Sequence, residues 1–146
     1  MNIYLDNSFL NRPFDNQDIE TNRLETEILF FILKLIKEKN VILVNSSVIE
    51  YENSLNPFSE RKVFVEEILS LAKIYQNLNE KIKKMAVFVE SETRIQPVDS
   101  LHIATAEFAK VDFFISCDYN LVVKYKGNLK VVAPLDFIKY YENRDR

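Results

Sequence analysis

Short apolar runs alternate along the chain with longer amphipathic segments. Four short runs rich in apolar residues predict strands, at residues 1–6, 41–44, 113–116 and 129–132, and the run at 41–44 is apolar throughout. Apolar residues at helical spacing predict helices at residues 18–39, about 60–75, about 79–92, 97–110 and after Pro134. A further helix follows the second strand, with Ser46 or Ser47 as its cap and Asn56-Pro57 at its end, and residues 11–15 read as a loop.

Apolar strands that alternate with helices are typical of a parallel sheet covered on both faces. We therefore expect an α/β fold of three layers, α/β/α, around a central parallel sheet of about four to five short strands. The chain has 146 residues and is 47% hydrophobic, which is enough to bury one core. A single domain over residues 1–146 is the working prediction.

The helix at residues 18–39 is apolar on more than one side. Leu24, Ile28, Phe31 and Leu35 share one face, and the segment at 29–36 makes the opposite face apolar as well. Because a sheet can cover only one side of a helix, we expect the chain to associate with itself, most simply as a homodimer.

Composition excludes several classes of protein. One cysteine, Cys117, cannot form a disulfide framework, and the first residues lead directly into a strand pattern rather than a signal peptide, so we expect a cytoplasmic protein. The longest apolar stretch, 28–36, contains Lys34 and falls short of the roughly 20 residues that span a bilayer, so no membrane association is expected. A single glycine rules out a Gly-rich phosphate loop.

The net charge is unfavourable for nucleic-acid binding but does not exclude it. The formal charge is −3 and the isoelectric point is near 5.3, whereas nucleic-acid binders usually show a basic footprint. If four carboxylates are committed to metal, the remainder of the chain is close to neutral. The basic group at Lys81, Lys83 and Lys84 is typical of a solvated helix face.

Carboxylates occur where a parallel sheet would gather them. Asp6 and Asp118 follow predicted strands, Glu50 and Glu52 lie on the helix after the second strand, and Asp99 lies in the first turn after Pro97. Like charges this close require either strong proton binding or a divalent cation. Oxygen ligands favour Mg²⁺ or Mn²⁺, which can activate water and stabilise charge on a phosphodiester.

Each of these residues also has a purely structural interpretation. Asp6 and Asp118 fit as caps of a turn or helix, and Asp99 fits as a favourable first-turn charge. His102, one turn after Asp99, is more typical of a packing or hydrogen-bonding residue than of a catalytic base. The coincidence of three acids at positions that one fold brings together favours the functional interpretation.

Three segments resemble PIN-domain nucleases in sequence, order and spacing: residues 3–8 (IYLDNS), 99–106 (DSLHIATA) and 114–118 (FISCD). The resemblance covers nearly the whole chain. It implies a PIN-like fold and a set of carboxylates that bind Mg²⁺ or Mn²⁺ and cut RNA. In this sequence the set falls on Asp6, Glu52, Asp99 and Asp118.

The resemblance also separates the two glutamates. The family pattern places its glutamate about six residues after the serine that opens the helix, which selects Glu52 over Glu50. Residues two apart on a helix point to roughly opposite faces. We expect Glu52 to face Asp6, Glu50 to face solvent or a basic side chain, and Val48, Tyr51 and Leu55 to form an inward apolar stripe. The segment after Asp118 lacks a further acid that some members have, so the number of metal ions stays open.

The resemblance implies a metal-dependent endoribonuclease. Many small, single-domain members are the toxin of a toxin–antitoxin pair, so RNA and an antitoxin protein are the expected partners. Arg12 either contacts a phosphate or pairs with Asp15. The first alternative is a catalytically inactive PIN-like module that binds RNA or protein. The second is a phosphoryl-transfer or receiver domain, whose essential lysine follows a strand, whereas Lys124 and Lys126 fall in a predicted helix.

Overall fold

The computed structural model describes residues 1–144, so the last two residues of the predicted domain lie outside the described residues. Within the described range the chain forms five strands, eight α-helices and one 3-10 turn, η1 (Arg12–Phe14). The strands are β1 (Asn2–Leu5), β2 (Ile42–Ser46), β3 (Ile74–Gln76), β4 (Phe113–Ile115) and β5 (Lys130–Val132). The helices are α1 (Asn7–Leu10), α2 (Glu20–Lys37), α3 (Ser47–Ser54), α4 (Ser59–Leu69), α5 (Glu80–Thr93), α6 (Pro97–Phe108), α7 (Tyr119–Lys124) and α8 (Pro134–Asn143).

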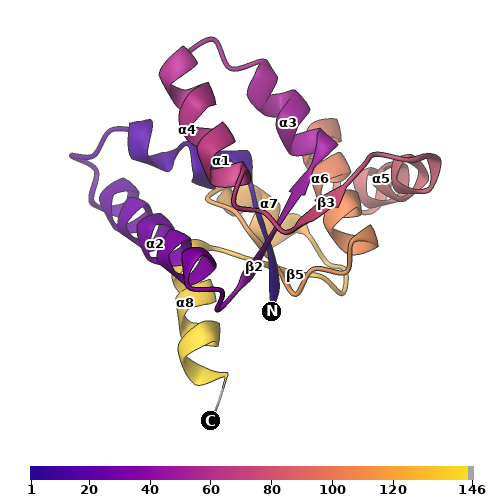
Figure 1. The fold of residues 1–146 in the computed structure, drawn as a ribbon. Helices are drawn as coiled ribbons and strands as arrows, with labels where there is room; N and C mark the ends of the chain where they lie inside the picture. Colours follow the sequence, from indigo (N-terminus) through magenta and orange to yellow (C-terminus); the bar gives the residue numbers. More distant parts are fainter. Residues whose placement is uncertain (145–146) are drawn as a thin grey trace.

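The strands form one parallel sheet in the order β3-β2-β1-β4-β5. Helices α2 and α8 lie on one face of the sheet and α5 and α6 on the other, which gives three layers (Figure 1). The predicted α/β/α fold with a parallel sheet is therefore confirmed. None of the helices in the described part of the chain is both long and apolar enough to cross a membrane.

The path of the chain creates a crevice beside the central strand. Ile3 of β1 pairs with Leu43 of β2 on one side and with Phe113 of β4 on the other. The chain first moves outward through β2 and β3, then returns to add β4 and β5 on the other side. At such a switch point the segments that leave the two neighbouring strands diverge, and ligands bind outside the carboxyl ends. Asp6 and Asp118 follow these two strands.

The central strand is buried on both faces. Ile3, Tyr4 and Leu5 have no exposed surface, and the Tyr4 ring stacks on Phe114 of β4 with centroids 5.1 Å apart. Alternation of polar and apolar residues is absent because helices cover both sides of the strand. This explains why the apolar runs located β1, β2, β4 and β5 in the sequence.

The predicted helix at 60–75 is wrong in its second half. Helix α4 ends at Leu69, and residues 74–76 form the edge strand β3, which pairs only with β2. An edge strand of three half-exposed residues lacks the apolar run of a buried strand. The predicted loop at 11–15 contains η1, which follows the short helix α1.

The predicted faces of two helices also need correction. Helix α2 buries Ile28, Leu29, Ile32, Leu35 and Ile36, whereas Leu24 and Phe31 are 42% and 40% exposed. Two apolar stripes lie next to each other on α2, so periodicity alone did not decide which one packs on the sheet and α8.

Helix α3 was assigned an inward stripe that the structure only partly contains. Val48 is buried, but Tyr51 and Leu55 are each 63% exposed. The buried positions are Val48, Ile49 and Asn53, and the Asn53 amide donates to the Lys62 carbonyl of α4 at 3.2 Å. A polar residue thus occupies an inward position because α4 offers it a hydrogen-bond acceptor.

The packing of α2 predicts unequal costs for two chemically identical substitutions. Leu29→Ala should lower the free energy of unfolding by about 2–5 kcal/mol, because it leaves a cavity in the core. Leu24→Ala should cost less than about 1 kcal/mol, because that side chain is largely exposed. Urea denaturation of both variants measures the difference, and equal costs would contradict the assigned face.

Candidate functional site

Asp6 is a buried carboxylate at the end of β1, with 4% of its surface exposed. One oxygen accepts from the backbone N–H of Asn7 at 2.8 Å, which caps α1. The other accepts from the hydroxyls of Ser8 at 2.9 Å and Ser116 at 2.6 Å. The capping interpretation of Asp6 is therefore correct, and it coexists with a position at the switch point of the sheet.

Ser116 connects the segments that follow β1 and β4. Its hydroxyl donates to Asp6 and accepts from the backbone N–H of Asp118 at 2.9 Å. The backbone N–H of Cys117 donates to Ser8 at 3.2 Å. Sequence reasoning did not single out Ser8 or Ser116, although a serine directly after the apolar run of β4 was a usable signal.

Glu52 is held by a buried chain of polar side chains. His102 Nε2 lies 2.9 Å from Glu52 Oε1 and donates to it, since a carboxylate can only accept. His102 Nδ1 lies 2.7 Å from the Tyr4 hydroxyl, which is in turn 2.9 Å from Ser46 Oγ. His102 is fully buried and hydrogen-bonded at both ring nitrogens. It thus orients Glu52 rather than facing an open cleft.

Glu50 points elsewhere. Its two oxygens accept from the Asn45 amide at 3.2 Å and from the Tyr75 hydroxyl of β3 at 2.7 Å. Glu50 is exposed, so the expectation that it faces solvent is confirmed, and its hydrogen-bond partners are a neutral amide and a phenol rather than a basic side chain. Tyr75 belongs to the edge strand that sequence reasoning missed.

The structure brings the predicted acids to one pocket. Asp6, Glu52 and His102 each offer a ligand atom within 4.8 Å of the others, and among residues 1–144 this is the group close enough to share a metal ion. Asp99 and Asp118 stand outside that tight group but line the same pocket as Asp6 and Glu52.

Asp99 and Asp118 hold the local positions that their sequence context indicated. Asp99 lies in the first turn of α6 after Pro97. Asp118 is the N-cap of α7, and its side chain accepts from the backbone N–H groups of Asn120 and Leu121 at 3.0 and 3.3 Å. Both of these hydrogen bonds use the same oxygen of Asp118, so its other carboxylate oxygen is compatible with a role in the pocket.

The pocket disfavours full ionisation of its acids. Burial raises the pKa of Asp6, although the His102 charge and the hydrogen bonds from Ser116 and Ser8 oppose that shift. Burial, followed by the Asp6 charge, raises the pKa of Asp99 to about 6. Burial lowers the pKa of His102, but the Glu52 hydrogen bond and the nearby carboxylates outweigh it and leave the pKa above its ordinary value. The acidic pocket thus contains more negative than positive charge.

Arg12 lies at the same pocket but is engaged by carboxylates. Its guanidinium contacts Asp15 at 2.9 Å and Glu25 at 3.0 Å. The pairing with Asp15 that the sequence suggested is therefore present. Contact of Arg12 with a phosphate stays a prediction.

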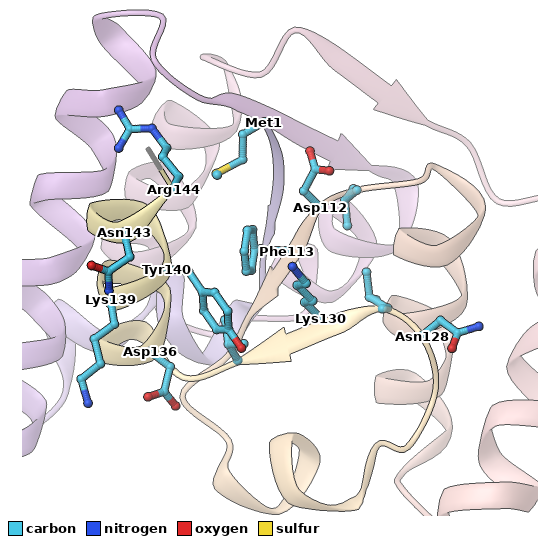
Figure 2. A pocket seen from close by; sticks show the side chains of 13 residues that line it. Met1, Asp112, Phe113, Asn128, Lys130, Asp136, Lys139, Tyr140, Asn143 and Arg144 are labelled. Atoms are coloured by element: carbon cyan, nitrogen blue, oxygen red, sulfur yellow. The ribbon is translucent and has the colours of Figure 1, made fainter. Parts of the chain in front are cut away.

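A larger pocket lies at the opposite end of the sheet and is lined partly by residues at the strand starts, such as Met1, Asp112 and Lys130 (Figure 2). The Lys130 ammonium stands over the rings of Phe113 and Tyr140 at 5.3 and 5.4 Å. Active sites of open parallel sheets form at the carboxyl ends of strands instead. We therefore assign the functional site to the smaller acidic pocket.

Comparison with known proteins identifies the fold. No family model and no curated protein matches the chain. A chain of VapBC2 from Rickettsia felis, in a crystal structure with a DNA fragment from the promoter, matches with a TM-score of 0.60 and 15% sequence identity, over 91% of this chain and 98% of that chain. PAE2754 from Pyrobaculum aerophilum matches with a TM-score of 0.58 and 14% identity, over 97% of this chain and 96% of that chain. The chain has the PIN-domain fold.

The PIN-domain fold agrees with the resemblance found in the sequence, and the strand order excludes a receiver domain. A receiver domain has the strand order 2-1-3-4-5, whereas the order here is β3-β2-β1-β4-β5. At identities of 14% and 15% the likeness shows the fold, and the activity has to be argued from the site.

The shifted carboxylates predict how stability depends on pH without metal. The pKa of Asp99 is about 6 in the folded chain, against 3.8 for an ordinary aspartate. The folded state therefore binds the proton more tightly, and stability should fall as pH rises from 3.8 through about 6. His102 contributes with the same sign above pH 6.5, because its pKa is also raised.

Thermal unfolding in EDTA from acidic to neutral pH measures this dependence. Asp99→Asn should reduce the loss of stability between those limits, whereas Asp136→Asn, which lines the other pocket, should leave it unchanged. An identical pH slope in wild type and Asp99→Asn would refute the electrostatic account.

Proposed function

We propose that this chain is a metal-dependent endoribonuclease in which Asp6, Glu52, Asp99 and Asp118 hold Mg²⁺ or Mn²⁺. The observation that carries the proposal is the presence of all four carboxylates in one pocket at the switch point of the sheet. Structural caps alone do not require four acids from four different segments to share a pocket.

The residues present fit a divalent ion of this type. The donor set consists of carboxylate oxygens, the ligands that Mg²⁺ and Mn²⁺ prefer. Asp6 is buried beside other acids and its pKa is raised, so an added positive charge would relieve an unfavourable field. His102 has no ring nitrogen available for a metal ion in this orientation, because both are hydrogen-bonded.

The surrounding residues keep the carboxylates in place. Ser8 and Ser116 fix the oxygens of Asp6, and His102 fixes Glu52 through a bond to one oxygen. Such partners typically orient ligands in metal sites. A bound ion supplies an activated water and offsets the charge that develops on the phosphate. The chain provides the acidic, oriented pocket, and no nucleotide cofactor is needed.

We further propose that the chain acts in the cytoplasm as the toxin of a toxin–antitoxin pair. The small size, the single cysteine Cys117 and the structural likeness to a chain of VapBC2 support this role. An antitoxin protein would then be its physiological partner and RNA its substrate. An inactive PIN-like module that binds RNA or protein is the alternative, and the complete set of four acids argues against it.

Cleavage should require both the metal and Asp6. Incubated with mixed single-stranded RNA and Mn²⁺, the wild type should cut, while EDTA should abolish cleavage. Asp6→Asn should lower the rate at least about a hundredfold, since outer partners of a metal ligand alone are worth 10- to 100-fold.

Asp136→Asn is the matched control for this assay, because it removes a carboxylate that does not line the acidic pocket, and it should cut at the wild-type rate. Equal cleavage by every sample, EDTA included, would indicate a contaminating nuclease. If the wild type cleaved none of several varied RNAs with either Mg²⁺ or Mn²⁺, the result would favour the inactive PIN-like module.

Metal binding can be measured without activity. Mn²⁺ should raise the melting temperature of the wild type in a concentration-dependent way, because it binds the folded state. Glu52→Gln should weaken this shift, whereas Glu50→Gln should retain it, since Glu50 is bonded to Asn45 and Tyr75. The opposite result would make Glu50 the ligand.

Self-association of the chain remains a proposal, and we propose the exposed part of α2 as the contact surface. Phe30 and Phe31 of α2 are 52% and 40% exposed. Light scattering at micromolar concentration should give a dimer mass for the wild type and a lower mass for Phe30→Asp. Phe88→Asp, on α5, is the control. A monomer mass for the wild type would refute the proposed homodimer.

A further inference from the structure

A phenylalanine is held on the rim of the acidic pocket by a defined turn. The backbone N–H of Phe58 donates to Asn56 Oδ1 at 3.0 Å, and Pro57 restricts the backbone between them. The Asn56 amide donates to Asn11 Oδ1 at 3.3 Å, which ties the turn to the segment after α1. The Phe58 side chain lines the pocket, yet the residue is 56% exposed. Its ring is therefore presented to solvent beside the carboxylates.

An arginine accompanies this ring. Arg61, in the first turn of α4, lines the same pocket, with its guanidinium carbon 4.6 Å from the centroid of Phe58 and 5.6 Å from that of Phe14. Phe14 is anchored by an edge contact with Phe64 at 5.3 Å. The guanidinium thus stands against two aromatic rings of different segments.

Arg61 differs from Arg12 in its charge partners. Arg12 is paired with two carboxylates, whereas within residues 1–144 no carboxylate lies at ion-pair distance from Arg61. Contact with an aromatic ring holds a cation without neutralising it. Arg61 therefore offers a positive charge to an anion at the mouth of an otherwise acidic pocket.

An exposed aromatic ring next to an arginine matches the chemistry of single-stranded nucleic acid. An unpaired base can stack on the ring while its phosphate contacts the cation. Bases within a duplex have both faces covered by their neighbours and do not offer a free face. Resting on the proposed nuclease function, we propose that Phe58 and Arg61 form a platform that binds one unpaired nucleotide of the RNA substrate beside the carboxylates.

The platform assigns the substrate contact to residues that the sequence did not single out. It places the phosphate contact on Arg61 rather than on Arg12. It also restricts the substrate class to RNA with an unpaired nucleotide near the cleaved bond. Selectivity then arises from stacking, which is tolerant of base identity.

The test is the affinity for a short fluorescent single-stranded RNA, measured by anisotropy in EDTA so that no cleavage occurs. Phe58→Ala and Arg61→Gln should each weaken binding about tenfold, as expected for loss of a stacking or phosphate contact. Phe88→Ala, on α5, and Arg23→Gln, on α2, are the matched controls and should bind as the wild type does. Phe58→Tyr should restore affinity because it keeps the ring.

The dependence of RNA affinity on salt concentration separates the phosphate contact of Arg61 from the stacking contact of Phe58. Arg61→Gln should reduce the slope of log affinity against log salt by about 0.7, the value for one phosphate contact on a single strand. Phe58→Ala should leave that slope unchanged. Melting temperatures of all variants show whether each one is folded. A duplex of the same sequence should bind more weakly than the single strand and should be insensitive to Phe58→Ala.

The outcomes distinguish this inference from the function on which it rests. If the wild type binds and cuts RNA while both platform variants bind like their controls, the platform is wrong and the nuclease proposal stands. If the wild type neither binds nor cuts any RNA, both proposals fail, and the exposed ring and cation then fit a protein partner instead.

Discussion

The buried carboxylate of Asp6 is the feature on which the rest of the site depends. It follows the central strand, where the sheet changes direction, so its neighbours come from the segments after β1 and β4, from α3 and from α6. Two serine hydroxyls and one backbone N–H hold it. A charge in this position is costly unless it is bonded and compensated. The bonds are present in the structure, while compensation by protein cations is incomplete.

That imbalance links the fold to the proposed chemistry. Burial raises the pKa of Asp6 and of Asp99, and the positive charge of His102 opposes the shift without removing it. His102 is itself committed to Glu52 and Tyr4. The pocket therefore keeps uncompensated negative charge, which lowers stability and which a bound cation would offset. Proteins that hold like charges together at a functional site commonly lose some stability by doing so.

The sequence predicted the layers of the fold, and the acids Asp6 and Asp118, because both follow from local patterns. Apolar runs mark the buried strands, and acids after such runs mark strand ends. The choice of Glu52 over Glu50 came instead from the resemblance to a family. Features that depend on tertiary partners were missed. The edge strand β3 has too little burial to leave a pattern, and the two apolar stripes of α2 differ only in what packs against them. Ser116, Tyr4 and the Phe58–Arg61 pair acquire their roles from residues distant in the sequence.

The central claim is that the acidic pocket, and not another part of the surface, holds a divalent ion. An anomalous-scattering map from a crystal grown with Mn²⁺ tests it directly, because the signal locates manganese without reference to activity. The account predicts a peak bonded to Asp6 and to at least one more of Glu52, Asp99 and Asp118. A map with no peak in this pocket at saturating Mn²⁺, or with its strongest peak beside Asp112 and Asp136 in the larger pocket, would contradict it.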